Sequence, residues 1–284
     1  MRKSLWAFLL VFLAGCGPQT FFYYPNRILY DDPARLNIRY ETVSYPSLDG
    51  KTIYALFFPS RKKPQGTVVF FHGNFGNVSN HFGECLFLIG RGFDVLIFDY
   101  EGYGASEGRP TPKRTFEDGI ASVRYIHNRN PNLEIAAFGQ SLGGAVATVV
   151  AAKEPLVKAV VIEASFTSYR AMARTALKRS FLTWLLFPIV PLFLNHDFDP
   201  IDFIASISPR PILMIHGDHD KTVPSFMSEQ LFEKAQEPKR LWMIPGADHL
   251  TCRRVAGKEY DDKVVEFLTQ ALTDSPTVKD KDSR

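Results

Sequence analysis

The fold of this chain is decided by the stretch Gly139-Gln140-Ser141-Leu142-Gly143-Gly144, which follows the apolar run 134–138 and precedes a segment of small residues. The run is typical of a buried strand, and the segment after it is typical of a helix. A serine flanked at two residues on each side by glycine, between strand and helix, is the nucleophile-elbow pattern. A turn tight enough to present Ser141 above a sheet edge leaves no room for a Cβ at Gly139 or Gly143. The alternative is a glycine-rich connection with an incidental serine; the strand and helix on either side favour the elbow.

The composition is that of an ordinary globular protein, with 45% hydrophobic and 22% charged residues in a chain of 284. This length permits one large α/β domain or two small ones, and unbroken alternation of strands and helices favours one. The net charge of +3 gives no support for a nucleic-acid-binding surface. The 24 Phe and 11 Tyr suffice to fill a core and to line an apolar pocket.

The first residues have the three parts of a secretory signal. Residues 1–3 are a basic start, residues 5–13 are almost wholly apolar, and small residues then precede Cys16. The apolar run is too short to span a bilayer comfortably, so residues 1–15 are predicted to be a signal peptide. The ending resembles a bacterial lipobox, which implies cleavage before Cys16 and attachment of several acyl chains to it. The alternatives are an uncleaved anchor and an ordinary signal in which Cys16 is incidental.

The lipobox resemblance also predicts a location. Gly17 after the cysteine carries no acidic retention signal, so the expected place is the periplasmic face of the outer membrane in a Gram-negative host. In that oxidising compartment Cys85 and Cys252 could form a disulfide, or they could be two buried free thiols. The sequence does not decide between these.

The rest of the chain predicts one α/β domain at residues 38–273. Residues 16–37 are expected to be a lipidated tether and lead-in, which lies either against the domain or near the lipid surface, and residues 274–284 are a polar tail. Alternating strands and helices predict a mostly parallel sheet with helices on both faces. The expected strands are 38–45, 52–58, 67–71, 93–98, 134–138, 159–162, 211–215 and 240–244.

One region, at about 166–207, interrupts this alternation. Its apolar run 181–194 contains Pro188 and Pro191, which argue against a membrane-spanning helix and favour a small helical cap inserted between two strands. The helices expected outside it are 78–88, 112–129, 145–152, 225–235 and 259–272.

Three loops at strand ends together suggest acyl-transfer chemistry. Ser141 is a weak nucleophile and needs a base, and His249 follows the last strand, late enough for the order serine, acid, histidine. The acid is expected to be Asp220 rather than Asp218, which sits in the turn and could simply close it. Glu163, at the end of an earlier strand, is a minor alternative.

A tetrahedral intermediate also needs backbone N–H donors for its oxyanion. One is expected from Leu142, at the amino end of the helix after the elbow. The other is expected from Asn74, with Phe75 as the alternative, in the loop after the third strand. His72 in the same loop is interpreted as structural rather than catalytic.

These motifs together resemble the α/β-hydrolase superfamily. The branch they resemble is that of the eukaryotic α/β-hydrolase domain-containing depalmitoylating enzymes and their bacterial relatives. The resemblance implies an eight-stranded, mostly parallel sheet, no cofactor or metal, and the roles of nucleophile, acid and base for Ser141, Asp220 and His249. The matching motifs are His72-Gly73-Asn74, Gly139 to Gly144, His216-Gly217-Asp218-His219-Asp220 and His249.

The expected function is therefore a serine hydrolase of carboxylic esters or thioesters, palmitoyl groups included, that forms an acyl-enzyme on Ser141. Its partner is a small ester or acyl substrate, which Phe75, Phe181 and Trp184 are expected to contact. Two alternatives stay open, an aminopeptidase-like amide hydrolase and a non-catalytic envelope protein that uses the fold for binding or scaffolding.

Overall fold

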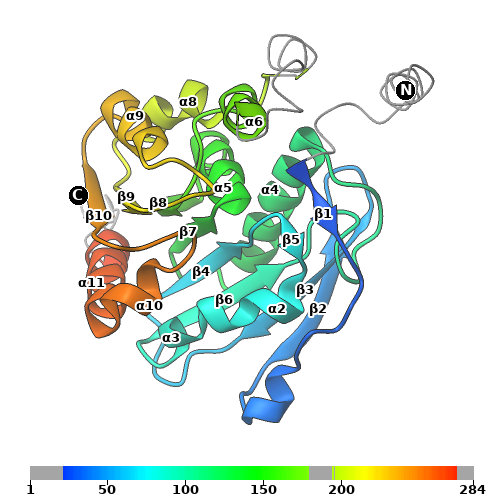
Figure 1. Ribbon diagram of the computed structural model, residues 1–284. Helices are drawn as coiled ribbons and strands as arrows, with labels where there is room; N and C mark the ends of the chain where they lie inside the picture. Colours follow the sequence, from blue (N-terminus) through cyan, green and yellow to red (C-terminus); the bar gives the residue numbers. More distant parts are fainter. Residues whose placement is uncertain (1–21, 179–193, 195, 274–284) are drawn as a thin grey trace, which may run out of the picture.

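An eight-stranded sheet forms the centre of the molecule in the computed structural model, which describes residues 22–178, 194 and 196–273 (Figure 1). The strand order is β10-β9-β8-β7-β4-β6-β3-β2. Strand β3 runs antiparallel to both of its neighbours, and all other pairings in this sheet are parallel. The expected α/β class is confirmed. The strands are β2 (Glu41–Pro46), β3 (Thr52–Phe58), β4 (Gly66–Phe71), β6 (Phe93–Phe98), β7 (Ile135–Gln140), β8 (Val157–Glu163), β9 (Ile212–Gly217) and β10 (Lys239–Ile244).

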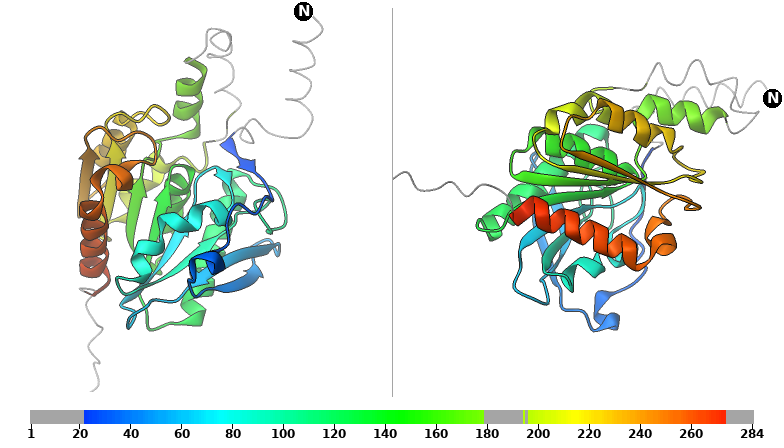
Figure 2. Two further views of the ribbon diagram at one scale, coloured as in Figure 1. Left: turned by 60° about the horizontal axis from the view of Figure 1, so that its bottom comes forward. Right: turned by 90° about the vertical axis from the view of Figure 1, so that its left-hand side faces the viewer.

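Helices cover both faces of the sheet. Figure 2 shows α9 and α11 on opposite sides of it. One apolar cluster lies beneath α4 (Pro112–Arg129), α5 (Leu142–Lys153), α8 (Pro200–Phe203) and α9 (Phe226–Lys234). The other lies beneath α2 (Val78–His81), α3 (Leu86–Ile89), α10 (Cys252–Ala256) and α11 (Lys258–Thr273).

Strand β4 shows why the central strands are apolar throughout. Val69 and Phe71 belong to the first cluster, whereas Val68 and Phe70 belong to the second. Successive side chains of a strand point to opposite faces, and here both faces are covered by helices. A continuous apolar run is therefore what a central strand of this sheet requires.

The lead-in before the sheet lies against the domain. Strand β1 (Tyr24–Pro25) pairs in parallel with β5 (Phe75–Gly76), just past the end of β4. Tyr23 is buried, and its hydroxyl lies 2.9 Å from the hydroxyl of Tyr169 in α6 (Tyr169–Lys178). After the short 3₁₀ helix η2 (Pro33–Leu36), the chain enters β2.

One expected helix is wrong in form. The segment 78–88 is not a continuous helix, because α2 is followed by the 3₁₀ turn η3 (Phe82–Glu84) and then by α3. Gly83 lies in the interruption, and a glycine inside a helix costs about 1 kcal/mol relative to alanine. The segment is therefore a chain of short turns.

The expected cap region is described in part. It contains α6, α8 and the 3₁₀ helix η5 (Ile204–Ile207), while residues 179–193 fall outside the described part of the chain. Among the residues that the structure describes, none belongs to a helix with the length and apolar character needed to cross a membrane.

The two cysteines of the domain are free thiols. Cys85 and Cys252 are both buried and are not joined to each other. Burial raises the pKa of each thiol well above its ordinary value. Of the two possibilities that the sequence leaves open, the structure has the unpaired one.

We expect iodoacetamide to alkylate Cys85 and Cys252 only after the protein is unfolded. In the native state both thiols are buried and their raised pKa values leave little thiolate to react. Peptide mass spectrometry measures the modification of each site. Reducing the protein before unfolding should not increase it, and a requirement for reductant would indicate a disulfide instead.

Candidate active site

The turn between β7 and α5 presents Ser141 with a strained backbone. Its φ is 54° and its ψ is −118°, a conformation that residues with a side chain rarely adopt. A Cβ on Gly139 would overlap the carbonyl of Gly143, and a Cβ on Gly143 would overlap the carbonyl of Phe71. The glycines of the motif thus allow the helix to start directly against two strands.

Hydrogen bonds from β8 and the residues after it hold this turn. The N–H of Ser141 donates to the carbonyl of Glu163 at 2.8 Å, and the Ser165 hydroxyl donates to the carbonyl of Ser141 at 3.0 Å. Because both backbone groups of Ser141 are engaged, the direction of its side chain is fixed.

Ser141, His249 and Asp220 lie in one line of hydrogen bonds at the carboxyl ends of β7, β10 and β9. His249 Nε2 is 3.1 Å from Ser141 Oγ, and His249 Nδ1 is 2.7 Å from Asp220 Oδ2. An ionised carboxylate can only accept, so Nδ1 carries the proton and Nε2 is free to accept from the serine hydroxyl. The Ser141 residue is 8% exposed, which leaves its hydroxyl within reach of a small substrate.

Asp220 is held as an ionised carboxylate. Its Oδ1 accepts from the N–H groups of Thr222 and Val223 at 2.7 and 2.8 Å, and its Oδ2 lies against His249 and His216. Burial alone would raise the pKa of Asp220, but the hydrogen bonds from the two histidines outweigh it and hold the pKa well below its ordinary value.

The two other acids considered from the sequence have different partners. Asp218 is exposed and accepts from the N–H of Gly246 and from His219. Glu163 is buried, and its Oε2 accepts from Gln140 and from the hydroxyl of Tyr260, both at 2.7 Å. Burial raises the pKa of Glu163. Within the described residues, Asp220 is the acid whose carboxylate contacts the imidazole of His249.

The two expected oxyanion donors come from two different loops of the chain. Leu142 is the first residue of α5, where N–H groups have no carbonyl partner within the helix. Asn74 lies between β4 and β5. His72 Nδ1 is 2.7 Å from the carbonyl of Gly73, which belongs to the same planar peptide as the N–H of Asn74 and so fixes its direction. That Leu142 and Asn74 bind an oxyanion stays a prediction.

Further contacts hold the loop that contains Asn74. The carbonyl of Asn74 accepts from the hydroxyl of Tyr103 at 2.8 Å and from the N–H of Tyr24 at 2.9 Å. The hydroxyl of Tyr100 donates to the carbonyl of His72. The sequence does not single out Tyr24 or Tyr103, because their partner is a backbone carbonyl, which leaves no trace in a pattern of side chains.

The expected substrate contacts are described for one residue of three. Phe75 is 56% exposed in β5, next to Asn74. Phe181 and Trp184 lie outside the described residues, as does Cys16. In the described part of the chain, no group of three or more His, Cys, Asp or Glu side chains is arranged to hold a metal ion.

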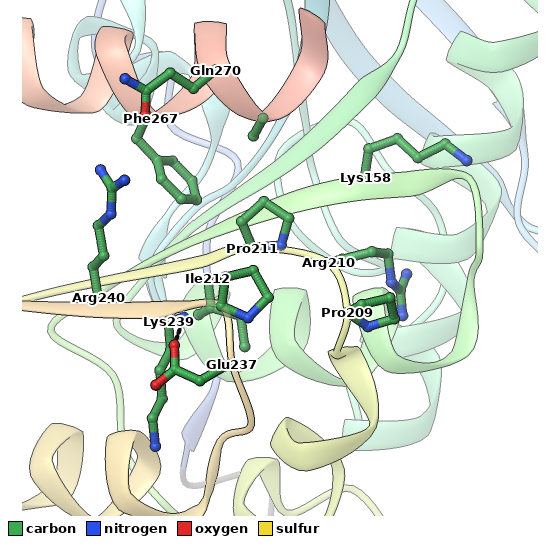
Figure 3. A pocket seen from close by; sticks show the side chains of 12 residues that line it. Lys158, Pro209, Arg210, Pro211, Ile212, Glu237, Lys239, Arg240, Phe267 and Gln270 are labelled. Atoms are coloured by element: carbon green, nitrogen blue, oxygen red, sulfur yellow. Dashed lines mark hydrogen bonds between the residues drawn. The ribbon is translucent and has the colours of Figure 1, made fainter. Parts of the chain in front are cut away.

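A cavity of about 500 Å³ lies at the opposite end of the strands from Ser141, where β9 and β10 begin (Figure 3). Two of the cations that line it are engaged with backbone carbonyls. Arg210 donates to the carbonyls of Glu154 and Val157, and Lys239 donates to those of Phe232 and Ala235. None of the three residues aligned at the serine lines this cavity, so it is separate from the candidate active site.

Comparison with known proteins gives relatives along most of the chain. Residues 62–202 match a family model described as serine aminopeptidase, S33. The protein YfhR of Escherichia coli K12, which is itself uncharacterized, is 33% identical across 89% of this chain and 87% of its own length. The α/β-hydrolase domain-containing protein WAV2 of Arabidopsis thaliana is 32% identical across 83% of this chain and 80% of its own length.

Solved structures share the fold at lower identity. The esterase Pf2001 of Pyrococcus furiosus superposes with a TM-score of 0.75 and 21% identity, covering 88% of this chain and 98% of the esterase. The strand order, the serine turn and the relatives agree: the chain belongs to the α/β-hydrolase superfamily.

Proposed function

We propose that this protein is a serine hydrolase that cleaves carboxylic esters or thioesters through an acyl-enzyme on Ser141. The observation that carries the proposal is the continuous line of contacts from Ser141 Oγ through His249 to Asp220, with distances of 3.1 and 2.7 Å. A nucleophile, a base and an acid that orients the base are the three parts that activation of a serine requires.

Each residue has a role in the proposed reaction. His249 Nε2 takes the proton of Ser141 as Oγ attacks the carbonyl carbon, and the N–H groups of Leu142 and Asn74 receive the charge on the oxygen. The imidazolium, stabilised by Asp220, then gives its proton to the leaving alcohol or thiol. In the second half, His249 deprotonates a water molecule as it attacks the acyl carbon. His249 then returns this proton to Oγ of Ser141 as the acyl–oxygen bond breaks and the carboxylic acid leaves.

Two observations bear on the bond that is cleaved. Several of the proteins with a similar fold are named esterases, such as Pf2001, which favours an ester. The matching family model is described as serine aminopeptidase, which favours an amide as the second candidate. Matched ester, thioester and aminoacyl-amide substrates with one acyl group separate them by kcat/KM. A palmitoyl thioester in the set tests the resemblance to depalmitoylating enzymes.

We expect Ser141→Ala to abolish both hydrolysis of short p-nitrophenyl esters and labelling by a fluorophosphonate probe. The alanine has no oxygen with which to form the covalent adduct. Ser206→Ala is the matched control, because Ser206 is exposed and its hydroxyl bonds only to a nearby carbonyl. Labelling that persists in Ser141→Ala would place the nucleophile elsewhere, and a wild-type chain that resists the probe would favour a non-catalytic binding protein.

We expect Asp220→Asn to lower kcat about a thousandfold or more, because an amide can donate to His249 Nδ1 and so favours the wrong tautomer. Steady-state kinetics on the same ester measures the loss. Asp218→Asn, two residues away and exposed, should keep nearly full activity, since its partners are Gly246 and His219. Equal losses in the two variants would contradict the assignment of Asp220 as the acid.

We also propose that the chain is anchored to a membrane of the cell envelope by lipid on Cys16. The support is the sequence of residues 1–16, with its basic start, short apolar run and small residues before the cysteine. Cys16→Ser should abolish incorporation of labelled palmitate in a bacterial host and move the protein out of the washed membrane fraction. Cys85→Ser, which changes a buried thiol, should leave both unchanged.

A further inference from the structure

His216, the penultimate residue of β9, has contacts that the proposed reaction does not use. Its side chain has no exposed surface. Nδ1 lies 2.5 Å from the hydroxyl of Ser228 in α9, and Nε2 lies 2.9 Å from the carbonyl of Val223 and 3.2 Å from Oδ2 of Asp220. His216 therefore touches the same carboxylate oxygen as His249.

The partners determine where the ring carries its proton. A carbonyl oxygen and an ionised carboxylate can only accept, so both contacts of Nε2 require a hydrogen on Nε2. In the neutral ring Nδ1 is then an acceptor, and the hydroxyl of Ser228, which is itself buried, supplies the matching hydrogen. Every hydrogen-bonding group in this arrangement has a partner.

The carboxylate of Asp220 is surrounded by two backbone N–H groups and two imidazoles, and His216 shares its one Nε2 hydrogen between Oδ2 and the carbonyl of Val223. Two backbone N–H groups hold Oδ1, which leaves Oδ2 directed between two imidazoles. Removal of His216 would leave His249 as the one side-chain donor on Oδ2 among the described residues. The carboxylate would then lose a contact that keeps Oδ2 directed toward His249.

We propose that His216 is a positioning residue for Asp220, donating from Nε2 to Oδ2 so that the carboxylate faces His249. The line of contacts then extends from Ser228 through His216, Asp220 and His249 to Ser141. The inference rests on the proposed function for its catalytic meaning. Its geometric content, the hydrogen on Nε2 and the bond to Asp220, stands independently of what the enzyme hydrolyses.

The other titratable groups around Asp220 do not take this place. Asp248 accepts from the N–H groups of Lys221 and His249 and is partly exposed. Cys252 is a buried thiol whose pKa is raised by burial and then by Glu163, with a smaller effect of Asp220. Neither supplies a hydrogen to Asp220, so the donors on Oδ2 are the two histidines.

Two substitutions separate the donor from the bulk of the ring. In His216→Gln the amide nitrogen reaches about the position of Nε2 and keeps a hydrogen for Asp220. In His216→Asn the shorter amide reaches only the position of Nδ1, so the bond to Asp220 is lost. Ser228→Ala removes the partner of Nδ1 and leaves the ring. Thermal unfolding shows whether each variant is folded.

We expect His216→Asn to lose about 10- to 100-fold in kcat through misplacement of the acid, with KM nearly unchanged. His216→Gln should restore most of kcat. No loss in His216→Asn, or equal losses in the two variants, would overturn the proposal and leave His216 a packing residue.

A measurement without turnover decides the proposal if the variants do not fold or the protein hydrolyses nothing. Nitrogen-15 spectra of the histidine rings in the full-length Ser141→Ala chain should show His216 with its hydrogen on Nε2. The Nε2 signal should also shift in a second variant that adds Asp220→Asn. A hydrogen on Nδ1, or a signal indifferent to Asp220, would overturn the inference. Failure of the proposed function alone would appear as inactive wild-type protein with both spectral results intact.

Discussion

The close approach of α5 to the ends of β4 and β7 is the constraint on which the rest of the site depends. Gly139 and Gly143 permit it, because a Cβ at either position would overlap a backbone carbonyl. The approach forces Ser141 into a strained conformation, which persists because the surrounding hydrogen bonds leave it no alternative. This conformation directs the side chain of Ser141 out of the turn and toward His249.

The site can be assembled from distant residues because parallel strands end at one edge. Ser141, Asp220 and His249 follow β7, β9 and β10. Ser141 and His249 therefore come into contact although they are more than 100 positions apart in the sequence. Two backbone N–H groups of its own loop hold one oxygen of Asp220, and His216 lies against the other. The acid is thus oriented by the chain around it before His249 arrives.

Much of this could be predicted because the relevant signals are local. Each of the eight strands of the main sheet is a short apolar or alternating run, and the turn of Ser141 lies between one of them and a helix, so the fold class and the place of this turn follow from neighbouring residues. Contacts without such a signal could not be predicted. Strand β1 is two residues long, Tyr103 bonds a backbone carbonyl, and Glu163 meets Tyr260 across 97 positions of sequence. Periodicity does not report pairings of this kind.

The pairing of β1 with β5 ties the start of the domain to the loop that contains Asn74. Tyr24 donates its N–H to the carbonyl of Asn74, and Asn26 accepts from Gly104 and from the side chain of Asn77. A force on the chain before Tyr24 would therefore act on the loop that carries the expected oxyanion donor before it reached the sheet. Tension on the chain before Tyr24 would therefore change the geometry of the Asn74 loop through these few backbone bonds.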